Sequence, residues 1–365
     1  MELHAIDRSE RTRIRDAWCE LEARARPPYF LSWGWVETWL DALPPAVPVR
    51  LYVARRAGAP VAAFFLGAGT RWRHRVLPSR SLYLNQTGID DYDQITIEYN
   101  GWLADGAAPS LAEVAARLPR GWDELHLSAL DAAGAPGADL EDESGELRVR
   151  IEREVSSPLV DLAQVRGAGD YVGLLGKNTR ATIRRSARLY EARGKLALDV
   201  ADTAGAALAT FDELVALHRR AWRDRGQDGA FGPFMRAFHQ RLIRTRMAAG
   251  EIQLVRVRAG ATTIGCLYNF VYRGTVAFYQ GGLVYEDDNK LKPGLVCHAE
   301  AVRHNAALGH AVYDFLGGDA QYKQSLATGA RALVWARVQR RRLRFALEDL
   351  ARELRDRVRE ARARS

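Results

Sequence analysis

One stretch of the chain, residues 278–323, limits the fold more than any other. A strand rich in aromatic residues is predicted to end at Gly281 and Gly282, and a polar loop then leads to a helix that starts at Pro293. That helix stops at Gly309, a short apolar run predicts a second strand, and a further helix follows. This order of strand, helix, strand and helix predicts an α/β fold in which strand ends and helix starts meet at one ligand site.

The start of the first predicted helix in this stretch is suited to phosphate. Backbone N–H groups at a helix start have no partner within the helix and attract anions. Lys290, Lys292 and Gly294 lie at this start, and His298 follows about one turn later. We therefore expect these four residues to contact the phosphates of a bound cofactor.

Three segments further upstream join this stretch to form a recognisable pattern. They are residues 29–40 (YFLSWGWVETWL), 176–194 (GKNTRATIRRSARLYEARG) and 217–222 (LHRRAW). Together with residues 278–323, they resemble the GNAT acyltransferase superfamily, and more closely its FemAB-like branch of large bacterial acyltransferases. The resemblance covers most of the chain. It implies an α/β fold of two tandem GNAT-like halves with mixed sheets, plus a C-terminal helix.

The resemblance and the charge pattern suggest how the chain is divided. We expect an N-terminal GNAT-like half on the acceptor side over residues 1–165, a C-terminal half on the donor side over 166–330, and a basic amphipathic helix over 331–365. The helix prediction depends on a leucine-rich stripe with heptad-like spacing from Leu343 to Val358. Such a short stripe typically docks on its own protein or on a second copy, so a homodimer is a further expectation.

The activity implied by the resemblance is acyl transfer. It implies an N-acyltransferase that moves an acyl group from a coenzyme A thioester, as co-substrate, to an amine of a small-molecule or peptide-like acceptor by direct attack. Two other interpretations stay open. One is a FemAB-like ligase that uses aminoacyl-tRNA, and the other is a non-catalytic protein that binds its ligand in the same cleft.

Acyl transfer needs a cradle for the carbonyl oxygen, a base and an acid. The Gly281–Gly282 pair is either a close approach of backbone to the donor or a simple bulge. Asp314 ends an apolar strand, where burial would raise its pKa, and is either the base or a structural hydrogen-bond acceptor. The resemblance implies that Tyr322 protonates the departing thiolate and that Lys323 stabilises that anion or binds phosphate.

Histidines offer one more catalytic candidate and no metal site. His218 lies on the apolar side of a predicted helix and is either a core histidine or a second base lining the acceptor cleft. His298, His304 and His310 lack the i, i+4 spacing of a helical zinc pair, so we expect no metal. The three cysteines are too few and too scattered to predict a disulfide framework.

A stripe of arginines is the strongest positive feature of the chain. Arg180, Arg184 and Arg188 recur every fourth residue on a predicted helix that starts near Lys177, with Asn178 or Thr179 as its cap. Cations near a helix start are unfavourable unless an anion is bound, so Arg180 and Arg184 are candidates to bind a coenzyme phosphate or the acceptor stem of a tRNA. The alternative is a face between domains on which these arginines pair with acidic residues.

Composition and charge limit the number of domains, the kind of partner and the cellular location that we expect. The chain has 365 residues, 47% hydrophobic residues and a net charge of +8, which suits two α/β domains with a polyanionic partner. No run of about 18 apolar residues is present, and the N-terminal residues are too charged for a secretory signal. We expect a cytoplasmic protein with no membrane span.

The remaining elements follow from periodicity and turn signals. In the first half we expect helices at 32–43 and 110–118, a hairpin across Ala57-Gly58, strands at 81–85, 94–99 and 124–130, and a polar connector at 134–144. In the second half we expect helices at 211–222 and 233–248, and strands at 252–258, 262–272 and 275–283.

Overall fold

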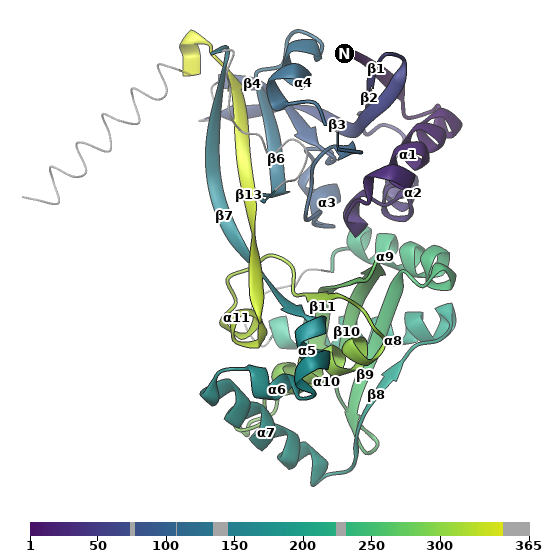
Figure 1. The fold of residues 1–365 in the computed structure, drawn as a ribbon. Helices are drawn as coiled ribbons and strands as arrows, with labels where there is room; N and C mark the ends of the chain where they lie inside the picture. The colour runs from purple at the N-terminus through teal and green to yellow at the C-terminus, as the bar shows by residue number, and fades with distance from the viewer. Residues whose placement is uncertain (74–76, 107, 134–144, 224–230, 346–365) are drawn as a thin grey trace, which may run out of the picture.

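A computed structural model of the chain describes residues 1–73, 77–106, 108–133, 145–223 and 231–345 (Figure 1). The first part of the chain contains these elements in order: β1 (Glu2–Asp7), α1 (Arg11–Ala25), η1 (Tyr29–Leu31), α2 (Trp33–Ala42), β2 (Val49–Arg56), β3 (Ala59–Arg73), β4 (Leu77–Leu84), α3 (Asp90–Asp93), β5 (Leu103–Ala104), α4 (Leu111–Arg117) and β6 (Glu124–Asp131). They form one α/β half.

The second part of the chain forms the other half and then returns to the first. Its elements are β7 (Leu147–Asp161), α5 (Leu162–Ala168), α6 (Tyr171–Leu174), α7 (Lys177–Glu191), β8 (Leu196–Val200), α8 (Ala204–Arg223), α9 (Pro233–Arg246), η2 (Met247–Ala249), β9 (Ile252–Ala259), β10 (Thr262–Tyr272), β11 (Thr275–Leu283), α10 (Pro293–Ala307), β12 (Val312–Asp314), α11 (Gln321–Leu326) and β13 (Gly329–Arg340).

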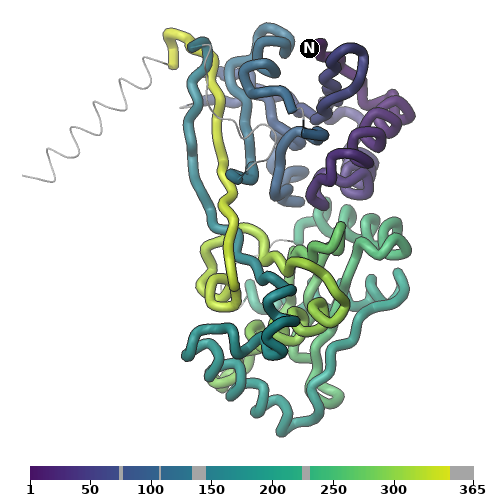
Figure 2. Tube along the Cα trace, viewed as in Figure 1, coloured from purple at the N-terminus to yellow at the C-terminus, as the bar shows by residue number. Residues whose placement is uncertain are grey.

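All the strands that the structure describes belong to one mixed sheet. The order is β1-β2-β3-β4-β6-β13-β7-β12-β11-β10-β9-β8, with β5 paired to β3. Only β4–β6 and β11–β12 pair in parallel among these neighbours. The long strands β7 and β13 lie side by side and run from one half to the other (Figures 1 and 2). The predicted fold class, two tandem GNAT-like α/β halves with mixed sheets, is confirmed in the described residues.

Three clusters of buried side chains form the core of the described residues, and one of them joins the halves. One packs α4 on the first half of the sheet, around Phe64 and Trp102, and another packs α7 and α10 on the second half. The third cluster runs between the halves, because it contains Trp18, Trp35 and Phe65 from the first half and Phe238 and Phe270 from the second. Burial of this shared apolar surface makes the two halves one packing unit.

Local signals explain several of the elements that were predicted. Ser32 accepts a hydrogen bond from the backbone of Trp35 and caps α2, and Ser110 forms a reciprocal capping box with Glu113 at the start of α4. Ala57 and Gly58 both have positive φ, which is the backbone of a tight hairpin turn between β2 and β3. Strands β10 and β11 follow their predicted bounds.

Three sequence predictions about secondary structure are wrong. Residues 94–99 alternate apolar and polar but form no strand, because Thr96 and Tyr99 have positive φ and buried amides hold the loop in place of a ladder. One of these buried amides is the side chain of Asn100, whose Oδ1 accepts a hydrogen bond from the side chain of Asn85 at 2.7 Å. Helix α7 begins after Gly176 with no side-chain cap from Asn178 or Thr179.

The third wrong prediction is the start of the C-terminal helix at 331. Residues 329–340 are strand β13, which pairs with β6 on one side and β7 on the other, and its Val334, Ala336 and Val338 pack in the same buried cluster as α4. The rest of the predicted stripe and the connector at 134–144 lie outside the described residues. The homodimer and the domain boundary at 165/166 stay predictions.

Two further observations concern membrane spans and the cysteines. None of the described helices combines the length and the apolar character needed to cross a membrane. Cys19, Cys266 and Cys297 are free thiols.

Candidate active site

The parting of two neighbouring strands creates the first cavity of interest. Strand β11 pairs with β10 along its length, but it pairs with β12 only where Thr275–Ala277 faces Val312–Asp314. Beyond Ala277, no described strand covers the second edge of residues 278–283. Such an edge offers backbone N–H and C=O groups to a ligand.

A cavity of about 660 Å³ lies along this uncovered edge, and we call it the β11 cavity. Its wall includes Phe278, which packs on the α10 face of the sheet, and Tyr279, which packs on the opposite face. The cavity therefore reaches both faces where the strands part. The predicted site residues in its wall are His218, Gly281, Lys292, Gly294, His298, Tyr322 and Lys323.

A β-bulge lies at the point where the edge becomes free. The register of β10 and β11 passes from Tyr268 opposite Gln280 to Asn269 opposite Phe278, so Tyr279 is one extra residue. A bulge releases the backbone of the extra residue from the ladder and turns it aside. The side chain of Tyr279 is anchored, because its hydroxyl donates to the carbonyl of Ile95 at 2.9 Å. The N–H of Tyr279 is thus a candidate donor to a carbonyl oxygen in the cavity.

Aromatic residues at the side of the β11 cavity have fixed protonation states at neutral pH. Burial raises the pKa of Tyr322 to about 12, so its phenol keeps a proton that it can donate. The ring of His298 stacks on Tyr322 with centroids 5.7 Å apart, and its Nδ1 lies 3.2 Å from the hydroxyl of Tyr313. Burial, with the charge of Lys323, lowers the pKa of His298 to about 3. His298 is therefore neutral, and its contact with phosphate stays a prediction.

Glu98 and Lys323 both hydrogen-bond to the backbone of Gly317, and Lys323 also lines the β11 cavity. The Lys323 ammonium donates to the carbonyls of Leu316 at 3.2 Å and Gly317 at 2.9 Å. Glu98 Oε2 accepts the N–H of Gly317 at 2.5 Å. Burial raises the pKa of Glu98 to about 7, although the Gly317 N–H and the charge of Lys323 lower it, and burial lowers the pKa of Lys323. Glu98 can therefore gain or lose a proton near neutral pH.

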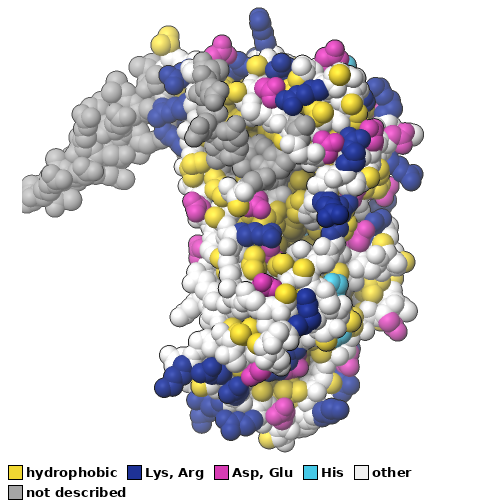
Figure 3. Space-filling model, viewed as in Figure 1, with side chains coloured by type: hydrophobic (Ala, Val, Ile, Leu, Met, Phe, Trp, Pro, Cys, Tyr) yellow, Lys and Arg dark blue, Asp and Glu magenta, His cyan; other side chains and the backbone are white. Residues whose placement is uncertain are grey.

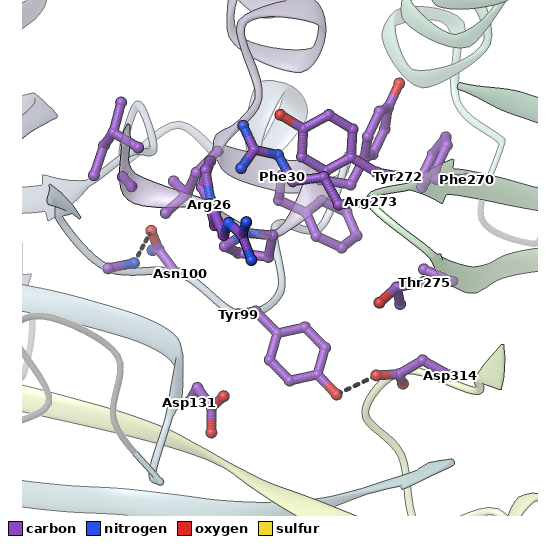
Figure 4. A pocket seen from close by; sticks show the side chains of 18 of the residues that line it. Arg26, Phe30, Tyr99, Asn100, Asp131, Phe270, Tyr272, Arg273, Thr275 and Asp314 are labelled. Carbon is purple, nitrogen blue, oxygen red and sulfur yellow. Dashed lines mark hydrogen bonds between the residues drawn. The ribbon is translucent and has the colours of Figure 1, made fainter. Parts of the chain in front are cut away.

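Asp314 is the central acceptor of a second polar group. Its Oδ2 accepts from the Tyr99 hydroxyl at 2.5 Å (Figure 4), and its Oδ1 accepts from the Leu316 N–H at 2.7 Å and the Ser157 hydroxyl at 3.2 Å. Burial raises the pKa of Asp314, as predicted, and the bonds from Tyr99 and Leu316 oppose that rise. Both carboxylate oxygens are occupied, so this geometry suits a residue that positions Tyr99.

Asp314 and Tyr99 line a second cavity, of about 780 Å³, between the two halves. We call it the inter-half cavity. Its wall comes from the end of α1, η1, residues 99–104 and the β10–β11 turn, and Figure 3 shows a hollow between the halves with hydrophobic side chains within it. The two cavities adjoin on β11, where Ala277 lines the inter-half cavity and Phe278 lines the β11 cavity. Two ligands could thus meet across one strand.

Comparison with known proteins agrees with this geometry. Residues 177–324, which include β11, α10, β12 and Tyr322, match the family model of the acetyltransferase (GNAT) domain. This part of the chain is a GNAT acetyltransferase domain. A search of curated protein sequences returned no match.

Solved structures extend the likeness to the whole chain. The crystal structure of FemX superimposes with a TM-score of 0.57 at 11% identity, covering 96% of this chain and 99% of FemX. The structure of L-PGS from Bacillus licheniformis superimposes with a TM-score of 0.51 at 10% identity, covering 92% of this chain and 96% of L-PGS. The C-terminal domain of a putative lysylphosphatidylglycerol synthetase from Agrobacterium fabrum superimposes with a TM-score of 0.50 at 11% identity. This match covers 92% of this chain and 95% of that domain. At these identities the likeness is one of fold.

Four predicted binding residues lie away from the wall of the β11 cavity of the GNAT domain. The structure corrects Gly282, because a Cβ there would lie 2.4 Å from the Leu214 carbonyl, so its missing side chain serves the packing of α8. Lys290 is exposed on the loop before α10. On α7, Arg184 pairs with Asp170 at 3.0 Å and Arg180 donates to the Gly173 carbonyl at 3.2 Å. Arg184 thus pairs with an acidic residue, as the alternative prediction has it, but its partner belongs to the same half of the chain.

The structure also places the predicted residue His218 and shows Glu98, which was not predicted from the sequence. His218 Nδ1 lies 3.3 Å from the Gly281 carbonyl, so the histidine is buried yet touches the wall of the β11 cavity. Glu98 was missed, because its segment resembles a plain strand and its partners lie more than 200 residues later in the chain. Among the described residues, no cluster of His, Cys, Asp and Glu could hold a metal ion.

Proposed function

We propose that the protein is an N-acyltransferase that moves an acyl group from a coenzyme A thioester to an amine of a small-molecule or peptide-like acceptor. The uncovered edge of β11, residues 278–283, is the observation that carries this proposal. The pantetheine arm of coenzyme A is a thin chain with two amide groups, so it can pair with a strand edge as an added strand does. Lys292 and the start of α10 are suited to its phosphates.

In the proposed reaction, the acceptor amine attacks from the inter-half cavity. Its nitrogen forms a bond to the thioester carbonyl carbon, and the carbonyl oxygen accepts from the N–H of Tyr279 as negative charge develops. Glu98 takes the proton that the amine loses, directly or through one water. The C–S bond then breaks, and Tyr322 gives its proton to the departing thiolate.

We assign the base role to Glu98 in preference to Asp314. Asp314 already accepts three hydrogen bonds, from Tyr99, Ser157 and Leu316, whereas Glu98 accepts one within the described part of the chain, from the Gly317 N–H. Asp314 would then hold the Tyr99 phenol at the floor of the acceptor cavity. Lys323, which lines the β11 cavity and whose charge lowers the pKa of Glu98, would stabilise negative charge on Glu98 and on the departing thiolate.

Thermal unfolding of the purified chain tests the donor. We expect acetyl-coenzyme A and free coenzyme A to raise the melting temperature in a saturable way at low and at moderate salt. A matched pair of variants locates the site, because Lys292 lines the β11 cavity and Lys290 on the same loop does not. Lys292→Ala should weaken coenzyme A binding roughly tenfold by loss of a charge-assisted contact, and Lys290→Ala should not.

The same assay contains the outcomes that contradict the proposal. Stabilisation only by bulk tRNA, lost as salt rises, would move the protein to the aminoacyl-tRNA-dependent class. Tight binding of a thioester with no transfer to any amine in a broad panel would instead favour a non-catalytic ligand-binding protein.

A further inference from the structure

Three arginines border the inter-half cavity. Arg26 follows α1, Arg273 lies in the turn between β10 and β11, and Arg331 lies near the start of β13, so three distant segments bring one residue type to one cavity. All three side chains are exposed. Figure 4 shows Arg26 and Arg273 side by side at one end of the cavity, and Figure 3 shows Lys or Arg side chains beside the hollow between the halves.

Within the described part of the chain, none of these three guanidinium groups forms an ion pair with a carboxylate. Arg273 donates to the backbone carbonyl of Glu22 at 2.9 Å and stacks on the ring of Tyr272 at 5.3 Å. Arg331 lies over the ring of Tyr99 at 5.6 Å. These contacts hold the guanidinium groups in place but do not neutralise them, which differs from the many arginines elsewhere that pair with acidic residues.

The carboxylates in the wall do not balance the arginines. Asp314 is engaged by Tyr99, Ser157 and Leu316 at the floor of the cavity, and Asp131 accepts the backbone N–H of Ala133 at 3.1 Å and keeps its charge. Two carboxylates therefore stand against three guanidinium groups. The border of the cavity is therefore positive, and its floor holds one buried carboxylate. A ligand with an anionic end and a cationic or amine end would match both.

The backbone at two of the arginines is costly. Arg26 has a φ of 47° and Arg273 a φ of 48°, in the left-handed region where a residue with a Cβ is disfavoured by roughly 1 kcal/mol. Glycine would adopt both positions without this cost. Long cationic side chains at two strained positions on the border of one cavity indicate a use for the charge.

We propose that the inter-half cavity binds an acceptor that carries an oxyanion, a carboxylate or a phosphate, held by Arg26, Arg273 and Arg331 while its amine points to the floor at Tyr99 and Asp314. This inference rests on the proposed function, since it names the class of acceptor. Guanidinium groups bind carboxylate and phosphate oxygens with paired hydrogen bonds. A volume of about 780 Å³ suits a small or medium-sized molecule.

Calorimetric titration with matched amines tests the proposal. Glucosamine 6-phosphate is compared with glucosamine, and glycine with glycinamide, each against the full chain at fixed ionic strength. We expect the anionic member of at least one pair to bind roughly tenfold more tightly, as a charge-assisted hydrogen bond predicts. A gain in the first pair identifies phosphate as the recognised group, and a gain in the second identifies carboxylate.

Variants separate the cavity from general charge. Arg26→Gln, Arg273→Gln and Arg331→Gln should each remove most of the preference for the anionic member. Arg188→Gln, which removes the same charge from the exposed face of α7, should leave it unchanged. Equal affinity within both pairs, no binding by any of the four amines, or an equal loss in Arg188→Gln would overturn the proposal.

A parallel titration with free coenzyme A keeps the two claims apart. If coenzyme A binds and the amines show no preference for an anion, the acceptor class alone is wrong. If an anionic amine binds through the three arginines but coenzyme A does not bind, the proposed function is wrong and the anion site stands.

Discussion

At the scale of single residues, Glu98 makes the sharpest prediction. A base must be unprotonated to work, and burial raises the pKa of Glu98 to about 7, so kcat/KM should rise with pH through about 7 and then level. Glu98→Gln keeps an acceptor for the Gly317 N–H but cannot take a proton. It should lower kcat/KM by roughly 100-fold or more and remove this limb of the pH profile. An unchanged limb in the variant would assign the titration to another group.

Tyr322 carries the complementary prediction. Tyr322→Phe keeps the ring that stacks on His298 and removes the proton given to the thiolate. We expect kcat to fall by roughly 100-fold with little change in donor affinity or melting temperature. An acyl donor with a more acidic thiol as leaving group should recover part of this loss. Equal losses for both donors would argue against an acid role.

At the scale of elements, two adjacent glycines on β11 have separate roles. A Cβ at Gly282 would lie 2.4 Å from the Leu214 carbonyl of α8, whereas a Cβ at Gly281 would contact Leu267 and Phe278 side chains at 3.3 Å. Gly282→Ala should lower the free energy of unfolding by about 1–3 kcal/mol, and Gly281→Ala by less. Gly281→Ala should instead weaken coenzyme A binding. Urea unfolding and calorimetry of both variants check the contrast, and the reverse pattern would contradict it.

The elements also explain how far the sequence could be interpreted. Strands β10 and β11 were predicted because their apolar runs are joined by a turn containing Gly274, and α10 because Pro293 and Gly309 mark its ends. Residues 94–99 carry the same alternation as a strand, and contacts with distant residues, among them Asp314, Gly317 and Tyr279, hold them as a loop. The site residue Glu98 could therefore not be found locally.

Strand β13 is a second element that local sequence could not predict, because its residues were predicted as the start of a helix. Val334, Ala336 and Val338 alternate as strand residues do, but the arginines and the leucine-rich segment after them favoured a helix. Its place between β6 and β7 depends on pairing partners about 200 residues earlier in the chain. Tyr322 and Lys323 were predicted from the resemblance of residues 278–323 to the GNAT superfamily, and both line the β11 cavity, whereas the arginines of the inter-half cavity come from three distant segments.

At the scale of the whole molecule, the shared core and the two long strands predict one cooperative unfolding transition. Thermal unfolding followed by tryptophan fluorescence and by far-ultraviolet circular dichroism should give coincident curves. Leu333 is fully buried in β13 between the two halves, and Leu333→Ala should lower the free energy of unfolding by about 2–5 kcal/mol. Leu343→Ala, at a side chain that is 86% exposed, is the control and should change little. Two separate transitions would show that the halves fold independently.

Hydrogen exchange with and without acetyl-coenzyme A tests the central claim most directly. The account predicts that the donor slows exchange of backbone amides in residues 278–283, where β11 lacks a second neighbour, and at the start of α10, with little change in α7. Unchanged exchange at β11 under saturating donor, or protection confined to α7, would contradict the placement of the donor between the parted strands.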